Sequence, residues 1–85
     1  MNQEISALRI RIDNLDKKLL QLLKKRFELT KEVGKIKKIK NLTIEDKKRE
    51  NEIIENKIKN SNLNSKFIKE FFKLIFKESK KLQNA

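Results

Sequence analysis

Apolar residues recur at alternating intervals of four and three positions through the first half of the chain. This spacing is the heptad seam of a long helix that packs against another helix, and it predicts one helix from about Gln3 to about Ile39. Arg26 occupies one of the nine seam positions. A guanidinium keeps its charge, so an arginine in an apolar seam needs an anionic partner, either another side chain or a ligand. The other eight positions are aliphatic: Leu8, Ile12, Leu15, Leu19, Leu22, Leu29, Val33 and Ile36.

Two shorter helices are predicted in the second half. The first spans about Ile44–Lys59, with Thr43 as its N-terminal cap and Asp46 three residues further on, in a variant of the capping box. A run of turn-forming residues, NSNLNS, separates it from a helix over about Ser65–Gln83. The first of these helices has a narrow apolar stripe and the second a broad apolar face. The stripe consists of Ile44, Ile53, Ile54 and Ile58, and the face of Phe67, Ile68, Phe71, Phe72, Ile75, Phe76 and Leu82.

The lengths of the three predicted helices bear on assembly. Each of the later helices is about half as long as the first, which extends for roughly 50 Å. Folded back, they would cover only part of its seam. A seam this regular favours a partner helix, and a second copy related by a two-fold axis supplies one. The sequence therefore predicts an all-α fold with three helices per protomer in an intertwined homodimer.

The composition agrees with an all-α fold and narrows the chemistry. The 85 residues, which we expect to form a single domain over 1–85, include no proline and one glycine. That glycine, Gly34, lies inside the first predicted helix, where it either permits close approach of another helix or weakens its own helix. Cysteine, histidine and tyrosine are absent, which excludes disulfides, thiolate metal sites and the usual general base near neutral pH. Any chemistry must be carried by the remaining polar and charged side chains.

The chain is strongly basic. Lysine and arginine number 23 against 12 aspartate and glutamate residues, a formal net charge of +11. Such an excess favours an anionic partner, whether nucleic acid, an acidic membrane or a small polyanion, but a solvated lysine-rich surface is an equal alternative. The N-terminal residues lack the pattern of a signal peptide, and no apolar run approaches a membrane span. The sequence predicts a soluble, cytoplasmic protein.

Polar residues fall on faces of the predicted helices that ought to be buried. They are Arg26 and Lys37 on the first helix, Asp46, Arg49 and Glu50 on the second, and Ser79 and Gln83 on the third. Arg9 lies off the edge of the seam. Surface ion pairs, a lysine-rich helix end and the edge of a core are the ordinary explanations for most of these residues. An arginine at the centre of a seam is unusual, however, and together the residues indicate a small cationic pocket between helices.

The order and spacing of these residues resemble those of the all-α chorismate mutases. The resemblance covers nearly the whole chain and rests on the segments LRIRIDNLDKKLLQLLKKRFELTKEVGKIK, EDKKRENEII and FIKEFFKLIFKESKKLQ. It implies a domain-swapped dimer of three-helix protomers, in which each active site is formed mostly by one chain and completed by the first helix of the other. It also implies the Claisen rearrangement of chorismate to prephenate in phenylalanine and tyrosine biosynthesis, with no metal or cofactor.

The resemblance further implies roles for individual residues. Arg26 and the partner's Arg9 would bind the two substrate carboxylates, helped by Ser79. Lys37 and Gln83 would donate hydrogen bonds to the ether oxygen of the breaking C–O bond. Together with Arg26, these two residues are the expected catalytic groups.

The second helix would bind the other end of the substrate. Glu50, with the backbone at Asp46, would hold the ring hydroxyl, and Arg49 would line the pocket. Two alternatives stay open at this point: an isochorismate-pyruvate lyase, which shares the fold, and a basic coiled-coil module that binds nucleic acid. Against the second alternative, two carboxylates would face the groove.

Overall fold

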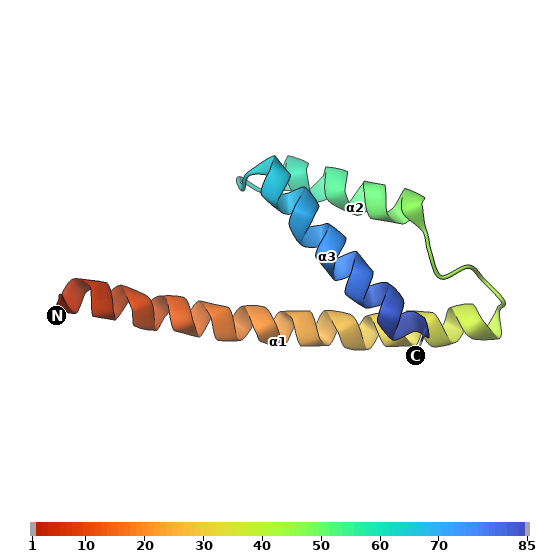
Figure 1. The fold of residues 1–85 in the computed structure, drawn as a ribbon, viewed down its shortest axis with the longest axis horizontal. Helices are drawn as coiled ribbons and strands as arrows, with labels where there is room; N and C mark the ends of the chain where they lie inside the picture. The colour runs from red at the N-terminus through yellow and green to blue at the C-terminus, as the bar shows by residue number, and fades with distance from the viewer. Residues whose placement is uncertain (1, 85) are drawn as a thin grey trace.

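The computed structural model describes residues 2–84, which form three helices joined by two loops (Figure 1). Helix α1 spans Gln3–Ile39, α2 spans Lys47–Asn60 and α3 spans Ser65–Asn84. No strand occurs in the described part of the chain, which confirms the all-α class. The predicted bounds of α1 are confirmed, and the end of α3 differs from the prediction by one residue.

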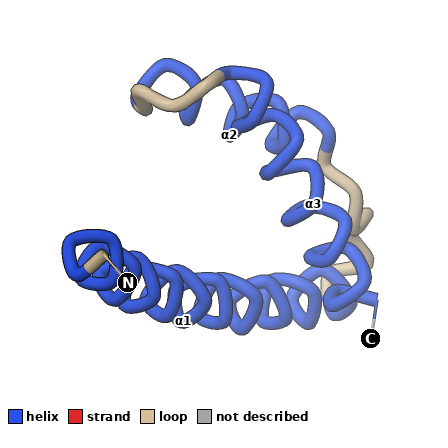
Figure 2. The backbone as a smooth tube through the Cα atoms, turned by 60° about the vertical axis from the view of Figure 1, so that its left-hand side comes forward, coloured by secondary structure: helices blue, strands red, loops and turns tan. Residues whose placement is uncertain are grey.

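Helix α3 joins the other two helices. It crosses the C-terminal half of α1 and also packs against α2, whereas within residues 2–84 no Cα atom of α1 lies within 8 Å of a Cα atom of α2 (Figures 1 and 2). The N-terminal half of α1 extends away from both shorter helices (Figure 1). The radius of gyration is 16.6 Å, compared with about 12 Å for a compact chain of this length. As predicted, the shorter helices cover only part of α1.

A hydrogen-bonded turn ends α1 and redirects the chain toward α2. Asn41 has a φ of 56°, in the left-handed region that asparagine tolerates better than most residues. The N–H of Leu42 donates to the carbonyl of Lys37 at 2.7 Å, and the N–H of Asn41 donates to the carbonyl of Lys38 at 3.2 Å. This pattern satisfies two carbonyls at the end of the helix.

The start of α2 differs from the prediction. The helix begins at Lys47 rather than Ile44, and its N-terminal cap is Asp46 rather than Thr43. The Asp46 carboxylate accepts a hydrogen bond from the backbone N–H of Arg49 at 3.0 Å, which is the role that the predicted capping box assigned to the threonine hydroxyl. Ile44 lies in the loop, where its carbonyl accepts a hydrogen bond from the Lys37 side chain of α1 instead of from a helical N–H.

The contact between α1 and α3 uses a row of α1 residues that lies beside the heptad seam. In this row Thr30 and Gly34 are buried, and Leu23 and Phe27 are half-buried. The buried apolar residues of α3 are Ile68, Ile75 and Phe76. The hydrophobic pattern did not reveal this row, because threonine and glycine do not register as apolar.

Gly34 permits the close approach of α3, which decides between the two interpretations of this residue. A Cβ atom added at Gly34 would lie 2.8 Å from the Cα atom of Gln83. Carbon atoms in ordinary contact are about 3.5–4.0 Å apart, so only glycine fits here without movement of the backbone.

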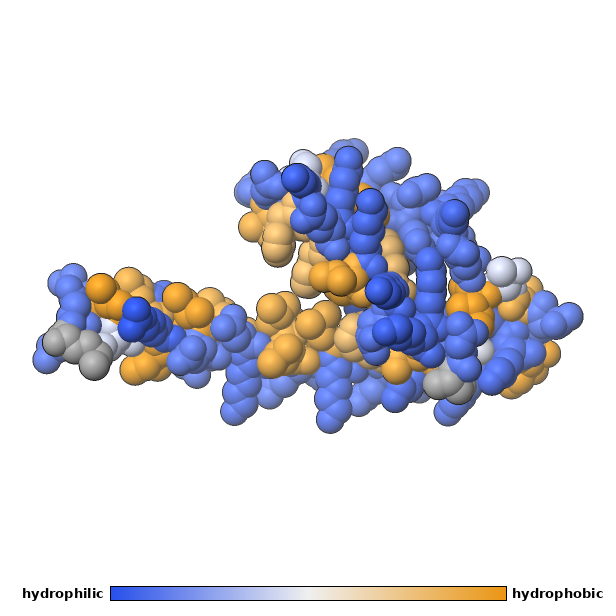
Figure 3. All heavy atoms as spheres, in the orientation of Figure 1, coloured by the Kyte–Doolittle hydropathy of each residue, from blue (hydrophilic) through white to orange (hydrophobic). Residues whose placement is uncertain are grey.

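The heptad seam itself remains uncovered. Its eight aliphatic residues are 45–63% exposed. Figure 3 shows hydrophobic side chains gathered along the N-terminal half of α1, which neither α2 nor α3 covers. None of the described helices is both long enough and apolar enough to cross a membrane.

Candidate active site

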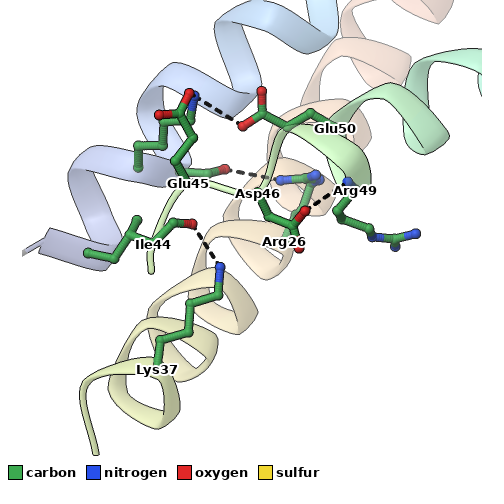
Figure 4. A network of polar contacts seen from close by, with 9 residues as sticks. Arg26, Lys37, Ile44, Glu45, Asp46, Arg49 and Glu50 are labelled. Atoms are coloured by element: carbon green, nitrogen blue, oxygen red, sulfur yellow. Dashed lines mark hydrogen bonds and ion pairs between the residues drawn. The ribbon is translucent and has the colours of Figure 1, made fainter. Parts of the chain in front are cut away.

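A cavity of about 190 Å³ lies where α3 meets the C-terminal half of α1 and the start of α2. Its walls carry four cationic side chains and two carboxylates, several of which are drawn in Figure 4. The lining residues are Arg26, Thr30, Val33 and Lys37 from α1, Ile44 and Asp46 from the following loop, Arg49, Glu50 and Ile53 from α2, and Phe76, Ser79, Lys80 and Gln83 from α3. The excess of cationic groups makes the cavity suited to an anionic ligand.

Arg26 has no acidic partner within the described chain. Its Nη1 atom donates a hydrogen bond at 3.1 Å to the hydroxyl of Ser79, which is only 6% exposed. Both ion pairs found among residues 2–84 are made by Lys80 and neither involves Arg26. Burial, and secondarily repulsion by Arg49, lowers the pKa of Arg26 below its usual value. The charge of this guanidinium is thus positioned by a hydroxyl but not neutralised.

Lys37 connects the cavity to the loop before α2. Its Nζ atom donates to the carbonyl of Ile44 at 2.8 Å, and Figure 4 shows the side chain reaching from α1 toward that loop. An ammonium group has three N–H donors, so this bond orients Lys37 and still leaves donors for a ligand.

The carboxylates of the α2 region have different surroundings. Asp46 caps the helix through its side chain, and its carbonyl accepts the N–H of Glu50 at 3.0 Å. The carboxylate of Glu50 forms an ion pair with Lys80 at 3.1 Å. Asp46 is therefore engaged in shaping the backbone, whereas Glu50 presents a partly buried carboxylate at the cavity.

Gln83 reaches the cavity from the last turns of α3. Its Oε1 atom is buried and has no hydrogen-bond partner among residues 2–84. A buried polar atom without a partner is unfavourable and rare in a folded protein. Rotation of the amide by 180° would place the Nε2 donor at the same position. The Gln83 amide is thus a polar group that a ligand in the cavity can satisfy.

Seven of the eight residues predicted for the site line this single cavity. Arg9 is the exception: it is exposed and lies 17 residues before Arg26, about 25 Å along α1. Within one chain, the geometry separates Arg9 from the other predicted residues.

One charged residue that lines the cavity, Lys80, was not predicted, and neither was its partner Glu45. Lys80 bridges Glu50 and Glu45, which lies in the loop before α2. Lys80 and Glu45 are 35 positions apart, so no helical periodicity connects them. The only available signal was that Lys80 directly follows Ser79, and adjacent residues on a helix point in different directions.

The family of the chain follows from comparison with known proteins. Residues 8–84 match the family model of chorismate mutase type II. The chain belongs to this family. The bifunctional chorismate mutase/prephenate dehydratase of Escherichia coli K12 is 40% identical over 82 residues, which cover 93% of this chain and 21% of that protein. The chain thus spans about a fifth of the length of the curated relatives that it matches first.

Solved structures agree with this membership. Chorismate mutase (form II) from Thermus thermophilus has a TM-score of 0.92 and 31% sequence identity, with 96% of each chain covered. A conserved hypothetical protein from Pyrococcus furiosus has a TM-score of 0.83 and 38% identity, with 98% of this chain and 99% of that chain covered. These matches favour the chorismate mutase family over the lyase and nucleic-acid-binding alternatives.

Proposed function

We propose that this chain is a chorismate mutase that converts chorismate to prephenate by a Claisen rearrangement. The observation that carries the proposal is the Arg26 guanidinium, which lies in a cationic cavity, bound to a hydroxyl and without a carboxylate partner among residues 2–84. A dianionic substrate would supply the missing charge. Membership of the chorismate mutase type II family supports the same reaction.

The reaction suits a chain that lacks histidine, cysteine and tyrosine. A single molecule breaks its ether C–O bond and forms a C–C bond, so no atom is gained or lost and no nucleophile or base is required. The protein has to hold a flexible dianion in a compact geometry and stabilise charge that develops on the ether oxygen. An acceleration of about 10⁶-fold corresponds to about 8 kcal/mol of transition-state stabilisation.

The cavity offers donors for both tasks. In our proposal Arg26, steadied by Ser79, binds one substrate carboxylate. Lys37 and Gln83 donate to the ether oxygen, where their hydrogen bonds strengthen as the C–O bond breaks. The two remaining N–H donors of Lys37 support its assignment. For Gln83 the support is a buried amide whose Oε1 has no partner among residues 2–84, because rotation of that amide by 180° presents the Nε2 donor to the ether oxygen.

The start of α2 would hold the opposite end of the substrate. Glu50, with the backbone at Asp46, would bind the ring hydroxyl, and the carboxylate would accept the hydrogen bond that this hydroxyl donates. Arg49 would line the pocket and add to its positive potential. Repulsion between Arg49 and Arg26 contributes to the lowered pKa of Arg26. An anion bound beside Arg26 would offset this repulsion.

We further propose that two chains form an intertwined homodimer. The support is the row of exposed aliphatic residues along the uncovered part of α1, which is costly to leave in water and fits a second α1 helix. In such a dimer the partner's Arg9 would enter the cavity of this chain and bind the second carboxylate. A single domain over residues 1–85 and a cytoplasmic location stay predictions from the sequence.

The test is to measure loss of chorismate and formation of prephenate by purified protein without added metal or cofactor. Arg26→Ala and Lys37→Ala are each expected to lower kcat/KM by at least about 10²-fold, because each removes a charge-stabilising donor. Lys25→Ala is the matched control, since Lys25 is an exposed neighbour of Arg26 outside the cavity. Full activity in both cavity variants would refute the proposed roles, and release of pyruvate from isochorismate instead would indicate a lyase.

A further inference from the structure

Lys80 ties together three segments at the edge of the cavity. Its Nζ atom, on α3, lies 3.1 Å from Oε2 of Glu50 in the first turns of α2. It also lies 3.2 Å from Oε1 of Glu45 in the loop between α1 and α2. No Cα atom of α1 lies within 8 Å of a Cα atom of α2 in the described structure, and this bridge links the start of α2 and the preceding loop to α3. We refer to Lys80, Glu45 and Glu50 as the Lys80 bridge.

The Lys80 bridge acts on the carboxylate that faces the cavity. The Glu50 side chain is 24% exposed and that of Glu45 is 49% exposed, so the Glu50 contact is the less screened of the two. The Lys80 contact at Oε2 restricts the rotation of the Glu50 carboxylate and leaves its other oxygen as an acceptor. Both glutamates raise the pKa of Lys80, Glu50 more strongly than Glu45.

Charge balance gives the Glu50 contact a second consequence. A carboxylate in the wall of a cavity that binds a dianion repels that ligand. Arg26 and Lys37 are needed for the substrate, and Arg49 faces Arg26. Lys80 is the cation in direct contact with Glu50, and it therefore offsets the carboxylate charge that would repel a bound dianion.

We propose that Lys80 is a positioning residue that holds the Glu50 carboxylate toward the substrate hydroxyl and cancels its charge toward the dianion. This inference rests on the proposed chorismate mutase function. A hydroxyl is bound to Glu50 equally in the substrate and in the transition state, because it takes no part in bond breaking. Loss of Lys80 should therefore weaken substrate binding and leave the chemical step nearly unchanged.

The experiment compares kcat and KM for chorismate in the unaltered chain, Lys80→Met, Glu50→Gln and the double variant. Lys80→Met should raise KM about tenfold, the size expected for a hydrogen bond to a charged group, with kcat within about twofold. In the Glu50→Gln background the same change should alter KM less than about twofold, because no carboxylate remains to be held or neutralised. Added salt should reduce the KM defect of Lys80→Met by screening the uncancelled charge.

Controls separate positioning from folding and from general charge. Lys81→Met removes the same charge from the exposed neighbouring residue and should leave KM unchanged. Lys80→Arg, which can also bridge two carboxylates, should restore most of the binding. If Lys80→Met does not fold, as judged by circular dichroism, the same comparison is made with Lys80→Gln.

The outcomes are distinct for the two proposals. Absence of turnover by the unaltered chain overturns the proposed function and this inference with it. With active enzyme, an unchanged KM in Lys80→Met overturns the inference alone. An equal rise of KM with and without the Glu50 carboxylate also overturns it, because Lys80 would then act independently of Glu50.

Discussion

Replacing Gly34 with alanine tests whether the close contact between α1 and α3 positions Gln83. The new Cβ atom would lie 2.8 Å from Cα, 3.0 Å from Cβ and 3.1 Å from Cγ of Gln83. Carbon atoms in contact are about 3.5–4.0 Å apart, so the two helices must separate by about 0.7–1.2 Å at this point. The nearest atom belongs to the backbone of α3, and a change of side-chain rotamer cannot relieve the contact.

Two opposing terms determine the effect of Gly34→Ala on stability. Alanine in place of glycine within a helix stabilises the folded state by up to about 1 kcal/mol. Overpacking a closely packed contact costs about 1–3 kcal/mol. The net expectation is a loss of about 1 kcal/mol, which lowers the unfolding temperature of a domain this size by about 4–8 °C. Thermal unfolding followed by circular dichroism measures this change.

The effect of Gly34→Ala on activity should exceed its effect on stability. A displacement of about 1 Å in a positioning group can lower a rate by about 10²-fold, and the displaced residue is one that we assign to the ether oxygen. We expect kcat for chorismate to fall by about 10–100-fold. If the loss arises through Gln83, Gly34→Ala should have little further effect in a Gln83→Ala background, since the two changes remove the same interaction.

A matched control and a refuting result complete this test. Lys35→Ala changes the exposed residue next to Gly34 and should alter neither the unfolding temperature nor kcat appreciably. If Gly34→Ala instead raised the unfolding temperature and kept full activity, α3 would be able to move away from α1 without loss of stability. The close contact would then have no role in positioning Gln83, and the reasoning would be wrong.

Three further predictions concern charges of the cavity and the dimer. Arg26→Leu should lower kcat/KM by at least about 10²-fold. Its unfolding temperature should equal or exceed that of the unaltered chain, because the lowered pKa of Arg26 means that the guanidinium charge disfavours the folded state at every pH below that pKa. Arg9→Ala and Arg26→Ala should each be inactive alone. An equal mixture refolded together should recover about a quarter of the activity, because half of the dimers are hybrids and each hybrid has one intact site of its two. No recovery would contradict the shared site, and light scattering measures whether the chain is a dimer. Lys80→Met lacks the Lys80 bridge and should unfold at a lower temperature than the unaltered chain below pH 10.5. This difference in unfolding temperature should vanish as the pH rises through the raised pKa of Lys80.

The three helices were predictable from the sequence, but the start of α2 was not. The heptad spacing predicted α1 from Gln3 to Ile39, because helical hydrogen bonds are local and the apolar stripe repeats with the helical period. The start of α2 was predicted three residues too early. Thr43 and Asp46 are both acceptable capping residues. In the structure Asp46 is the cap, and the carbonyl of Ile44 accepts from Lys37 instead of from a helical N–H.

The cavity was predictable as a set of residues but not as a set of contacts. The order of the polar residues indicated seven side chains that line one cavity, because position on a helical wheel and membership of a family are both readable in a sequence. The hydrogen bond from Arg26 to Ser79 joins residues 53 positions apart, and the Lys80 bridge joins a loop to α3. Such pairs depend on the crossing of α1 and α3, which no local pattern specifies.

The amino-acid sequence alone determined the helical class, the length of α1 and the excess of positive charge, since these follow from local periodicity and composition. Only the tertiary structure decided which row of α1 is buried, that Gly34 admits the backbone of Gln83, and that Arg26 has a hydroxyl rather than a carboxylate beside it. The physical reason is that packing depends on the distances between surfaces from separate elements. A difference of about 1 Å decides whether two atoms attract or clash.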